Sequence, residues 1–281
     1  MGPQPPKPLL LCLDAFGTLF TPIRPIAHQY TEVARTLGHT NFTAAQVGEA
    51  FKAAYKHEAR ERPNFGRAVI HKTFQPLVGE GREVHPELAP RLLARFASGE
   101  GYELRPGTKR VLRGLREMRR QREVVVGVVT NSDDRVPDVL ASLGVEVSPL
   151  RYGGGEADAT GERQWDVEFT VMSYDVGFEK PDARIFAAAE GMLGLLPRCR
   201  GMDLEGWEKV YVGDEYGKDV VGAMNAGWRS ILVEAEAEKL PQDVKDIGGR
   251  EPGDLLGTLN AEGGHVALSS LEKLGMWLGG R

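Results

Sequence analysis

Near the start of the chain stands Leu9-Leu10-Leu11-Cys12-Leu13-Asp14-Ala15-Phe16-Gly17-Thr18, an apolar run that ends at an acid and a Gly-Thr turn. Short apolar runs of this kind are typical of strands that are buried on both faces of a parallel sheet. Ligands of such sheets bind in a crevice beyond the carboxyl ends of the strands. We therefore expect Asp14 to lie at the mouth of a crevice. Taken alone, the segment also fits a strand that simply ends in a turn.

Three later segments place further polar groups at the ends of expected strands. They are Val124-Val125-Val126-Gly127-Val128-Val129-Thr130-Asn131, Gly177-Phe178-Glu179-Lys180-Pro181-Asp182, and Val210-Tyr211-Val212-Gly213-Asp214 with Asp219 five residues further on. Each has a plain alternative, because Asn131 and Asp219 also fit simple helix caps and a lone lysine is usually solvated. All of them together, in this order and each at a strand end, indicate a functional site.

Strands and helices alternate from Arg105 onward, a rhythm that is typical of a parallel βαβ sheet. We expect, in chain order, a helix to about 119, a strand at 124–129, a helix at 134–143, a strand at about 168–172, a helix at 183–195, a strand at 209–212, a helix at 217–226 and a strand at 230–233. A short capped helix that closes the fold is expected over 268–274. Two polar stretches, 152–164 and 234–264, are expected to be mobile loops.

The segment from residue 22 to residue 102 shows apolar residues at helical spacing and no strand-like run. Four helices are expected there, at 25–38, 43–62, 67–78 and 86–98, with Thr43 as an N-cap. The sequence therefore predicts an α/β protein with a Rossmann-like parallel-sheet core. The core comprises residues 1–21 and 103–281, and a four-helix cap domain of residues 22–102 is inserted after the first strand.

Composition excludes several classes of protein. The chain has 281 residues, 41% hydrophobic and 27% charged, and a net charge of -5 argues against a nucleic-acid surface. Its two cysteines, Cys12 and Cys199, cannot form a disulfide framework, which favours a reducing compartment. No apolar run reaches the roughly 18 residues of a membrane span, and the first eight residues lack the apolar segment of a secretory signal. We expect a cytoplasmic monomer or homodimer that binds neither nucleic acid nor membrane.

The four motifs resemble those of the haloacid dehalogenase (HAD) superfamily of hydrolases, and the likeness runs from Leu9 to about Leu274. The motifs fall on Asp14–Thr18, Thr130–Asn131, Lys180–Pro181 and Gly213–Asp219. A closer likeness, through residues 53–55, 63–66, 130–135 and 212–216, is to the subgroup of HAD-like hydrolase domain-containing proteins. The resemblance implies the HAD fold and a hydrolase whose substrate is selected by the cap domain.

Asp14 is the candidate nucleophile, because a carboxylate can form a covalent intermediate that water then cleaves. Asp14 and Asp214 together suit Mg²⁺, which prefers oxygen ligands and is usually held by one or two carboxylates. The family pattern adds the backbone carbonyl of Phe16 as a ligand. Asp219 would either bind the ion directly or hold a group that does. The resemblance thus implies Mg²⁺ as the cofactor.

The same motifs suggest how a small phosphorylated anion would bind. Thr130 and Asn131 would donate hydrogen bonds to a phosphoryl oxygen, and Lys180 would hold the transferring group or screen the repulsion between the substrate and the acids. The remaining expected substrate contacts are Phe16, Gly17 and Thr18 in the first motif and Asn64 in the cap segment.

Phe16 departs from the phosphatase pattern, which has a second Asp two positions after the nucleophile to protonate the leaving group. Positioned general acids contribute about 10² to 10⁴ in rate, so the loss matters most for poor leaving groups. True haloacid dehalogenases have an aromatic residue there, but they need no metal and lack the Gly-Asp pair that this chain keeps. They also use a cap arginine, whose nearest counterpart here is Lys52.

Three functions therefore stay open. The first is a Mg²⁺-dependent hydrolase of phosphate esters or anhydrides, weakened by the missing acid. The second is a metal-free hydrolase of the 2-haloacid dehalogenase type, and the third is a catalytically silent binding or regulatory protein.

Overall fold

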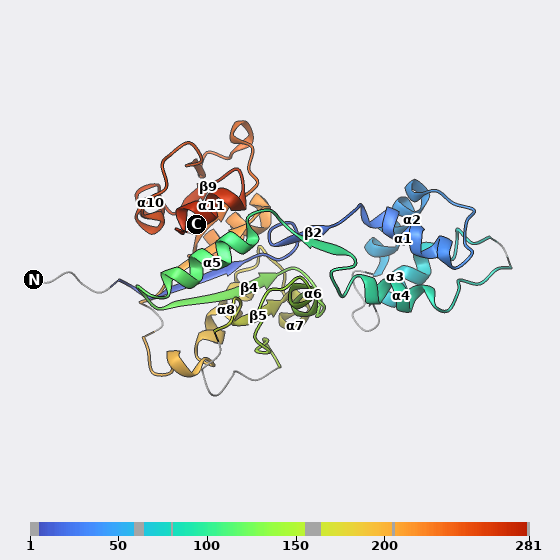
Figure 1. Cartoon of the computed structure of the whole chain (residues 1–281), viewed down its shortest axis with the longest axis horizontal. Helices are drawn as coiled ribbons and strands as arrows, with labels where there is room; N and C mark the ends of the chain where they lie inside the picture. The colour runs from blue at the N-terminus through green and yellow to red at the C-terminus, as the bar shows by residue number, and fades with distance from the viewer. Residues whose placement is uncertain (1–5, 59–64, 80, 155–163, 204–205, 280–281) are drawn as a thin grey trace, which may run out of the picture. The chain divides into compact units, whose positions relative to one another are not determined.

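A computed structural model describes residues 6–58, 65–79, 81–154, 164–203 and 206–279 (Figure 1). The chain divides into two compact units: a core unit, Met1–Thr21 with Leu104–Arg281, and an insert, Pro22–Glu103. The two chain connections between them run through a two-stranded sheet of β2 (Phe20–Pro22) and β3 (Tyr102–Leu104). That the insert serves as a cap stays a prediction.

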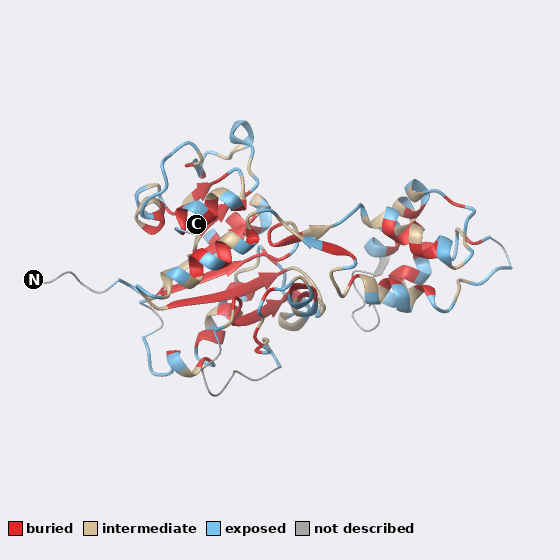
Figure 2. Ribbon diagram, in the orientation of Figure 1, coloured by how far each residue is buried: buried red, intermediate tan, exposed pale blue. Residues whose placement is uncertain are grey.

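A seven-stranded parallel sheet forms the centre of the core unit, in the order β5-β4-β1-β6-β7-β9-β8. Its strands are β1 (Leu9–Leu13), β4 (Val124–Thr130), β5 (Phe169–Met172), β6 (Glu208–Gly213), β7 (Arg229–Leu232), β8 (Lys245–Asp246) and β9 (His265–Ala267). Every residue of β1 and β4 is buried (Figure 2). Since side chains alternate along a strand, both faces of the sheet are covered. The predicted α/β class with a Rossmann-like parallel sheet is confirmed.

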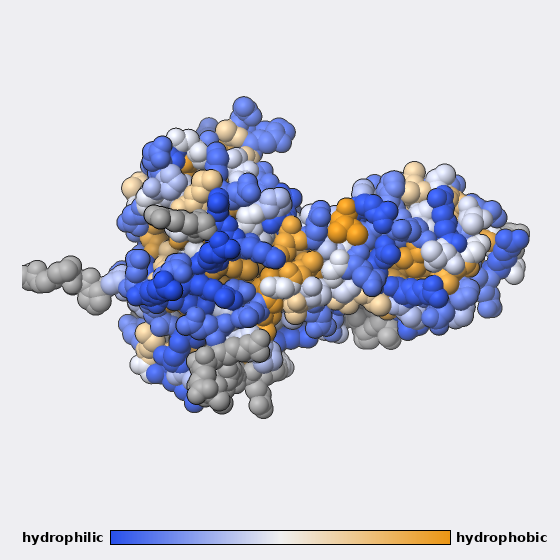
Figure 3. Space-filling model, viewed as in Figure 1, coloured by the Kyte–Doolittle hydropathy of each residue, from blue (hydrophilic) through white to orange (hydrophobic). Residues whose placement is uncertain are grey.

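Helices supply the cover. The core unit contains α5 (Thr108–Met118), α6 (Val136–Ser142), α7 (Ser173–Val176), α8 (Ala183–Leu193), α9 (Val221–Asn225), α10 (Leu255–Ala261) and α11 (Leu271–Trp277). Ile185 and Phe186 of α8 join one apolar cluster with Leu10 of β1. The surface over α5 is hydrophilic (Figure 3), because Lys109, Arg113 and Glu117 of this helix are exposed. As far as the structure describes the chain, none of its helices has the length and apolar character to cross a bilayer.

The insert contains four helices among its described residues: α1 (Ile26–Thr36), α2 (Ala44–Glu58), α3 (Phe65–Phe74) and α4 (Leu88–Arg95). Its core is aromatic, and the ring centroid of Tyr30 lies 5.3 Å from that of Phe51 and 5.4 Å from that of Phe96. Thr43 caps α2 as expected. Its hydroxyl accepts the Gln46 N–H at 3.3 Å, and its own N–H donates to Gln46 Oε1 at 2.9 Å.

Three expectations need correction or qualification. The prediction of a mobile loop over 234–264 is wrong, because this segment contains a 3₁₀ turn (Ala237–Lys239), β8 and α10. Elements this short offer too few positions to show a period. The helix expected at 217–226 begins with a π-helical turn, Tyr216–Val220, before α9. Of the loop expected at 152–164, residues 155–163 lie outside the described residues.

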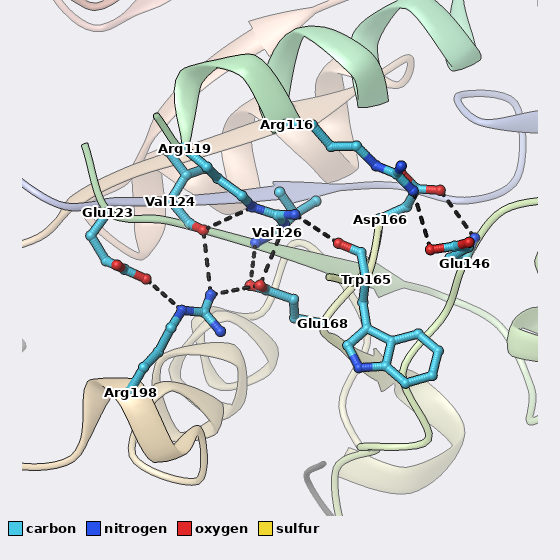
Figure 4. A network of polar contacts seen from close by, with 10 residues as sticks. All are labelled: Arg116, Arg119, Glu123, Val124, Val126, Glu146, Trp165, Asp166, Glu168 and Arg198. Carbon is cyan, nitrogen blue, oxygen red and sulfur yellow. Dashed lines mark hydrogen bonds and ion pairs between the residues drawn. The ribbon is translucent and has the colours of Figure 1, made fainter. Parts of the chain in front are cut away.

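A polar network ties the amino ends of β4 and β5 together (Figure 4). The buried Glu168 carboxylate accepts a hydrogen bond from Arg198 at 2.6 Å and from the Val126 N–H at 3.2 Å, and lies 3.4 Å from the Arg119 guanidinium. Arg198 also pairs with Glu123 at 2.5 Å. Because ligands bind at the opposite, carboxyl edge of such a sheet, we assign this network to stability.

Replacement of Glu168 by Ala should lower the free energy of unfolding by about 2–3 kcal/mol. Removing one partner of a buried ion pair costs about 3–5 kcal/mol, and the loss is smaller here because the Arg198 side chain is 40% exposed and can turn to water. Urea unfolding measures the effect. Glu146→Ala is the matched control, since it removes a half-exposed partner of Arg116 and should cost less than about 0.5 kcal/mol. Equal losses in the two variants would contradict the expectation.

Candidate functional site

The carboxyl ends of three neighbouring strands bring the predicted groups together. Asp14 follows β1, Thr130 ends β4 and Asp214 follows β6, and β1 lies between the other two strands. The N–H of Asp14 donates to the Val212 carbonyl at 2.8 Å, which continues the pairing of β1 with β6 up to the edge. Asp14 therefore lies at the sheet edge where the apolar run predicted it.

Three carboxylates cluster at this edge. One oxygen from each of Asp14, Asp214 and Asp219 lies within 4.8 Å of the others. Burial raises the pKa of Asp214 above its ordinary value and raises the pKa of Asp219 to about 6. Acids so close together disfavour one another's ionisation, and a cation relieves this. The oxygen donor set fits Mg²⁺.

Two glycines give the carboxylates their space. Gly17 has a φ of +86°, and a Cβ atom there would lie 2.5 Å from Asp214 Oδ2. A Cβ atom on Gly213 would collide with the Asp219 carboxylate. Both positions therefore need glycine, the first for its backbone conformation as well.

Lys180 lies between two of the acids. Its Nζ is 2.9 Å from Asp14 Oδ1 and 2.8 Å from Asp219 Oδ1, and the residue is 3% exposed. Burial works to lower the pKa of the ammonium, but the Asp14 and Asp219 carboxylates outweigh it and raise the pKa above its usual value. Asp14 Oδ1 also accepts the Ala15 N–H at 2.8 Å. Among the described residues, none donates a hydrogen bond to Asp14 Oδ2, so this oxygen is available to a substrate.

Asn131 and Thr18 make contacts that the sequence did not reveal. The Asn131 side chain donates to the Lys180 carbonyl at 2.9 Å and accepts the Lys180 N–H at 2.7 Å. It thereby holds the loop that carries the lysine. The Thr18 hydroxyl donates to Asp214 Oδ1 at 2.7 Å and so orients a candidate metal ligand. The substrate contacts expected of both residues stay predictions.

The other predicted residues are placed as follows. Thr130 is buried at the end of β4. Phe16 lies in the turn after β1 and is 42% exposed, with its ring edge-on to Phe20 at 6.0 Å between centroids. Its carbonyl as a metal ligand stays a prediction. Asn64 lies outside the described residues.

Tyr211 also contacts the site, although the motifs did not predict it. Its hydroxyl lies 2.6 Å from Lys180 Nζ. The available signal was one hydroxyl within an otherwise apolar strand, Val210-Tyr211-Val212.

Known proteins are similar to the chain in sequence and in fold. The bovine (Bos taurus) haloacid dehalogenase-like hydrolase domain-containing protein 3 is 29% identical over 249 residues, which cover 84% of this chain and 86% of that protein. The glyceraldehyde 3-phosphate phosphatase of Methanothermobacter thermautotrophicus is 38% identical over 79 residues, only 28% of this chain and 31% of the phosphatase.

Among solved structures, the 2-haloacid dehalogenase of Pseudomonas syringae matches with a TM-score of 0.54 at 19% identity, and the match covers 97% of this chain and 98% of the dehalogenase. This likeness concerns the fold alone. The family model of the haloacid dehalogenase-like hydrolases matches residues 9–227, which include all four motifs. The chain therefore belongs to the haloacid dehalogenase-like hydrolase family.

Proposed function

We propose that this enzyme is a Mg²⁺-dependent hydrolase of phosphate esters or anhydrides of small anionic molecules, with Asp14 as the nucleophile. One observation carries the proposal: the Lys180 ammonium lies between Asp14 and Asp219, with Asp214 in the same carboxylate cluster. Phosphoryl transfer depends chiefly on such positioning and charge. The partial likeness to a glyceraldehyde 3-phosphate phosphatase supports phosphoryl chemistry.

In the proposed reaction, Asp14 Oδ2 attacks phosphorus, and the bond between phosphorus and the leaving-group oxygen breaks as the new bond forms. Water then cleaves the aspartyl phosphate and releases inorganic phosphate. Lys180 and the Ala15 N–H hold Asp14 Oδ1, which fixes the carboxylate during the attack. Asp14, Asp214, Asp219 and the Phe16 carbonyl would hold Mg²⁺, which when bound neutralises charge on the reacting phosphoryl group.

The leaving group receives its proton from solvent, because Phe16 has none to give. Groups that leave readily as anions, such as aryl oxides and carboxylates, lose little from this. Alkoxides lose most, since a positioned acid is worth about 10² to 10⁴ in rate. The proposed enzyme should therefore prefer aryl or acyl phosphates to alkyl phosphates.

Turnover of an aryl phosphate should require Mg²⁺, and a chelator should abolish it. Asp214→Asn removes a charged ligand and should weaken Mg²⁺ binding at least about tenfold, measured by calorimetry as well as by activity. Asp254→Asn is the matched control, because this exposed residue caps α10 by accepting the Gly257 N–H, and Asn caps as well as Asp. Unchanged Mg²⁺ affinity in Asp214→Asn would refute the metal assignment.

The exposed aromatic Phe16 favours a second candidate, a metal-free hydrolase of 2-haloacids. The carboxylate cluster counts against it, since without a metal ion the nucleophile Asp14 and its two neighbours Asp214 and Asp219 carry more negative charge than Lys180 balances, and they would repel an anionic haloacid. Halide release from a 2-haloacid in the presence of a chelator would replace our proposal with this one. Ligand binding without turnover of any substrate would instead indicate a silent member of the family.

A further inference from the structure

The three hydrogens of the Lys180 ammonium all have partners. Two are directed at Asp14 Oδ1 and Asp219 Oδ1, and the third at the hydroxyl of Tyr211, 2.6 Å from Nζ. An ammonium has three donors and no acceptor. In this arrangement no donor of Lys180 is left for a phosphoryl oxygen, so the lysine acts on the two carboxylates.

The direction of the Tyr211 hydrogen bonds is fixed. The hydroxyl donates its hydrogen to the Val129 carbonyl at 2.6 Å, so its oxygen accepts from Lys180. The residue is fully buried, and burial together with the nearby carboxylates holds the pKa of Tyr211 well above its usual value. The phenol therefore keeps the hydrogen that it donates.

The sheet positions this hydroxyl. Tyr211 on β6 pairs with Cys12 on the central strand β1, and Cys12 pairs with Gly127 on β4. The phenol thus reaches over β1 to Val129, two residues nearer the carboxyl edge. Its ring packs edge-on against Phe186 of α8, with 5.1 Å between centroids and 72° between planes. The hydroxyl is held on a rigid part of the core.

Lys180 is fixed at both of its ends as a result. Asn131 holds the main chain through two hydrogen bonds, and the buried hydroxyl of Tyr211 accepts a hydrogen bond from the ammonium. Without the Tyr211 oxygen, a buried charged donor would lack its partner, and such a loss is expensive. The ammonium would then move to regain a hydrogen bond and would pull Asp14 Oδ1 with it.

We propose that Tyr211 is a positioning residue of the site: its hydroxyl holds the Lys180 ammonium, which in turn aims the Asp14 carboxylate at the substrate. The assignment rests on the proposed phosphohydrolase function. It predicts an effect on the chemical step and little effect on substrate binding, because Tyr211 acts through Lys180.

Tyr211→Phe tests the assignment, since it deletes one oxygen and keeps the ring. With an aryl phosphate and Mg²⁺, kcat should fall about 10- to 100-fold, as expected for one hydrogen bond to a charged group, while KM stays within about twofold. Ser230→Ala is the matched control. Ser230 pairs with Tyr211 across β6 and β7, is buried, and lies 2.9 Å from His265 Nδ1, so the variant also removes a buried hydroxyl contact. Its kcat should be unchanged.

A double variant shows whether Tyr211 works through the lysine. In a Lys180→Met background, Tyr211→Phe should cause no further loss of kcat. Should the phenylalanine variant fail to fold, Tyr211→Met carries the same expectation, because the flexible Met side chain fills irregular core space. Thermal unfolding of every variant separates a loss of fold from a loss of rate.

The possible failures are distinguishable. If the wild-type chain shows no Mg²⁺-dependent turnover, the proposed function falls and the Tyr211 assignment falls with it. If the wild type turns over and Tyr211→Phe retains its kcat, only the Tyr211 assignment is overturned. An equal loss of kcat in Ser230→Ala would also overturn it, because any buried hydroxyl in the sheet would then have the same effect.

Discussion

Asp14→Asn should abolish turnover, lowering kcat by at least about 10³-fold, which corresponds to about 4 kcal/mol of barrier. The amide is isosteric with the carboxylate, but its oxygen is neutral and a poor nucleophile. The fold should persist, because an amide oxygen can still accept hydrogen bonds from Lys180 and the Ala15 N–H. Loss of one buried charge also relieves the crowding of three acids at the sheet edge.

The measurement combines steady-state kinetics with mass spectrometry of acid-quenched enzyme. In the wild type, a phosphoryl group should be found on the peptide that contains Asp14, and in Asp14→Asn it should be absent. Asp254→Asn, an Asp-to-Asn change at the exposed cap of α10, should keep full activity. Substantial turnover by Asp14→Asn would disprove a covalent mechanism through this residue.

The sequence predicted the elements that make up the sheet edge, because buried parallel strands have a strong and local signature. The apolar runs before Asp14, Asn131 and Asp214 became β1, β4 and β6, and their order in the sheet brings the three strand ends together. Because parallel strands have their carboxyl ends at the same edge of the sheet, polar residues that follow such strands gather at that edge. Strand identity and carboxylate clustering were therefore accessible without coordinates.

Contacts between side chains were not accessible in the same way. Asn131 fitted a helix cap or a substrate donor, yet it binds the main chain of Lys180, 49 positions further along. Tyr211 reaches Val129 over an intervening strand, and that reach depends on the register of both neighbours of β1. Register follows from packing of the whole sheet, which a local pattern does not contain. The short strands β8 and β9 were missed for a different reason, because two or three residues offer too few positions to show a period.

Phe16→Asp should raise the turnover of alkyl phosphates by a factor that approaches the about 10² to 10⁴ of a positioned general acid. The change is tolerable at this position, because Phe16 is 42% exposed and lies in the turn after β1. The main chain stays supported, since the Gly17 N–H still donates to the Phe20 carbonyl at 2.9 Å. An introduced carboxyl would thus stand two residues after Asp14, in the place where the family's phosphatases carry their acid.

Two comparisons separate proton donation from a general change in the site. The aryl oxide of an aryl phosphate leaves without a proton, so turnover of aryl phosphates should rise far less than turnover of alkyl phosphates. A change in stability or binding would alter the turnover of both substrates alike. The Asn side chain in Phe16→Asn has the same size as that of Asp but has no acidic proton to donate, so this variant should increase the turnover of neither substrate. The gain in Phe16→Asp should also shrink as pH rises, because the acid must hold its proton. Equal effects on the two substrates, or no gain in a folded variant that binds Mg²⁺, would mean that leaving-group protonation is not what this site lacks, and would favour the haloacid hydrolase.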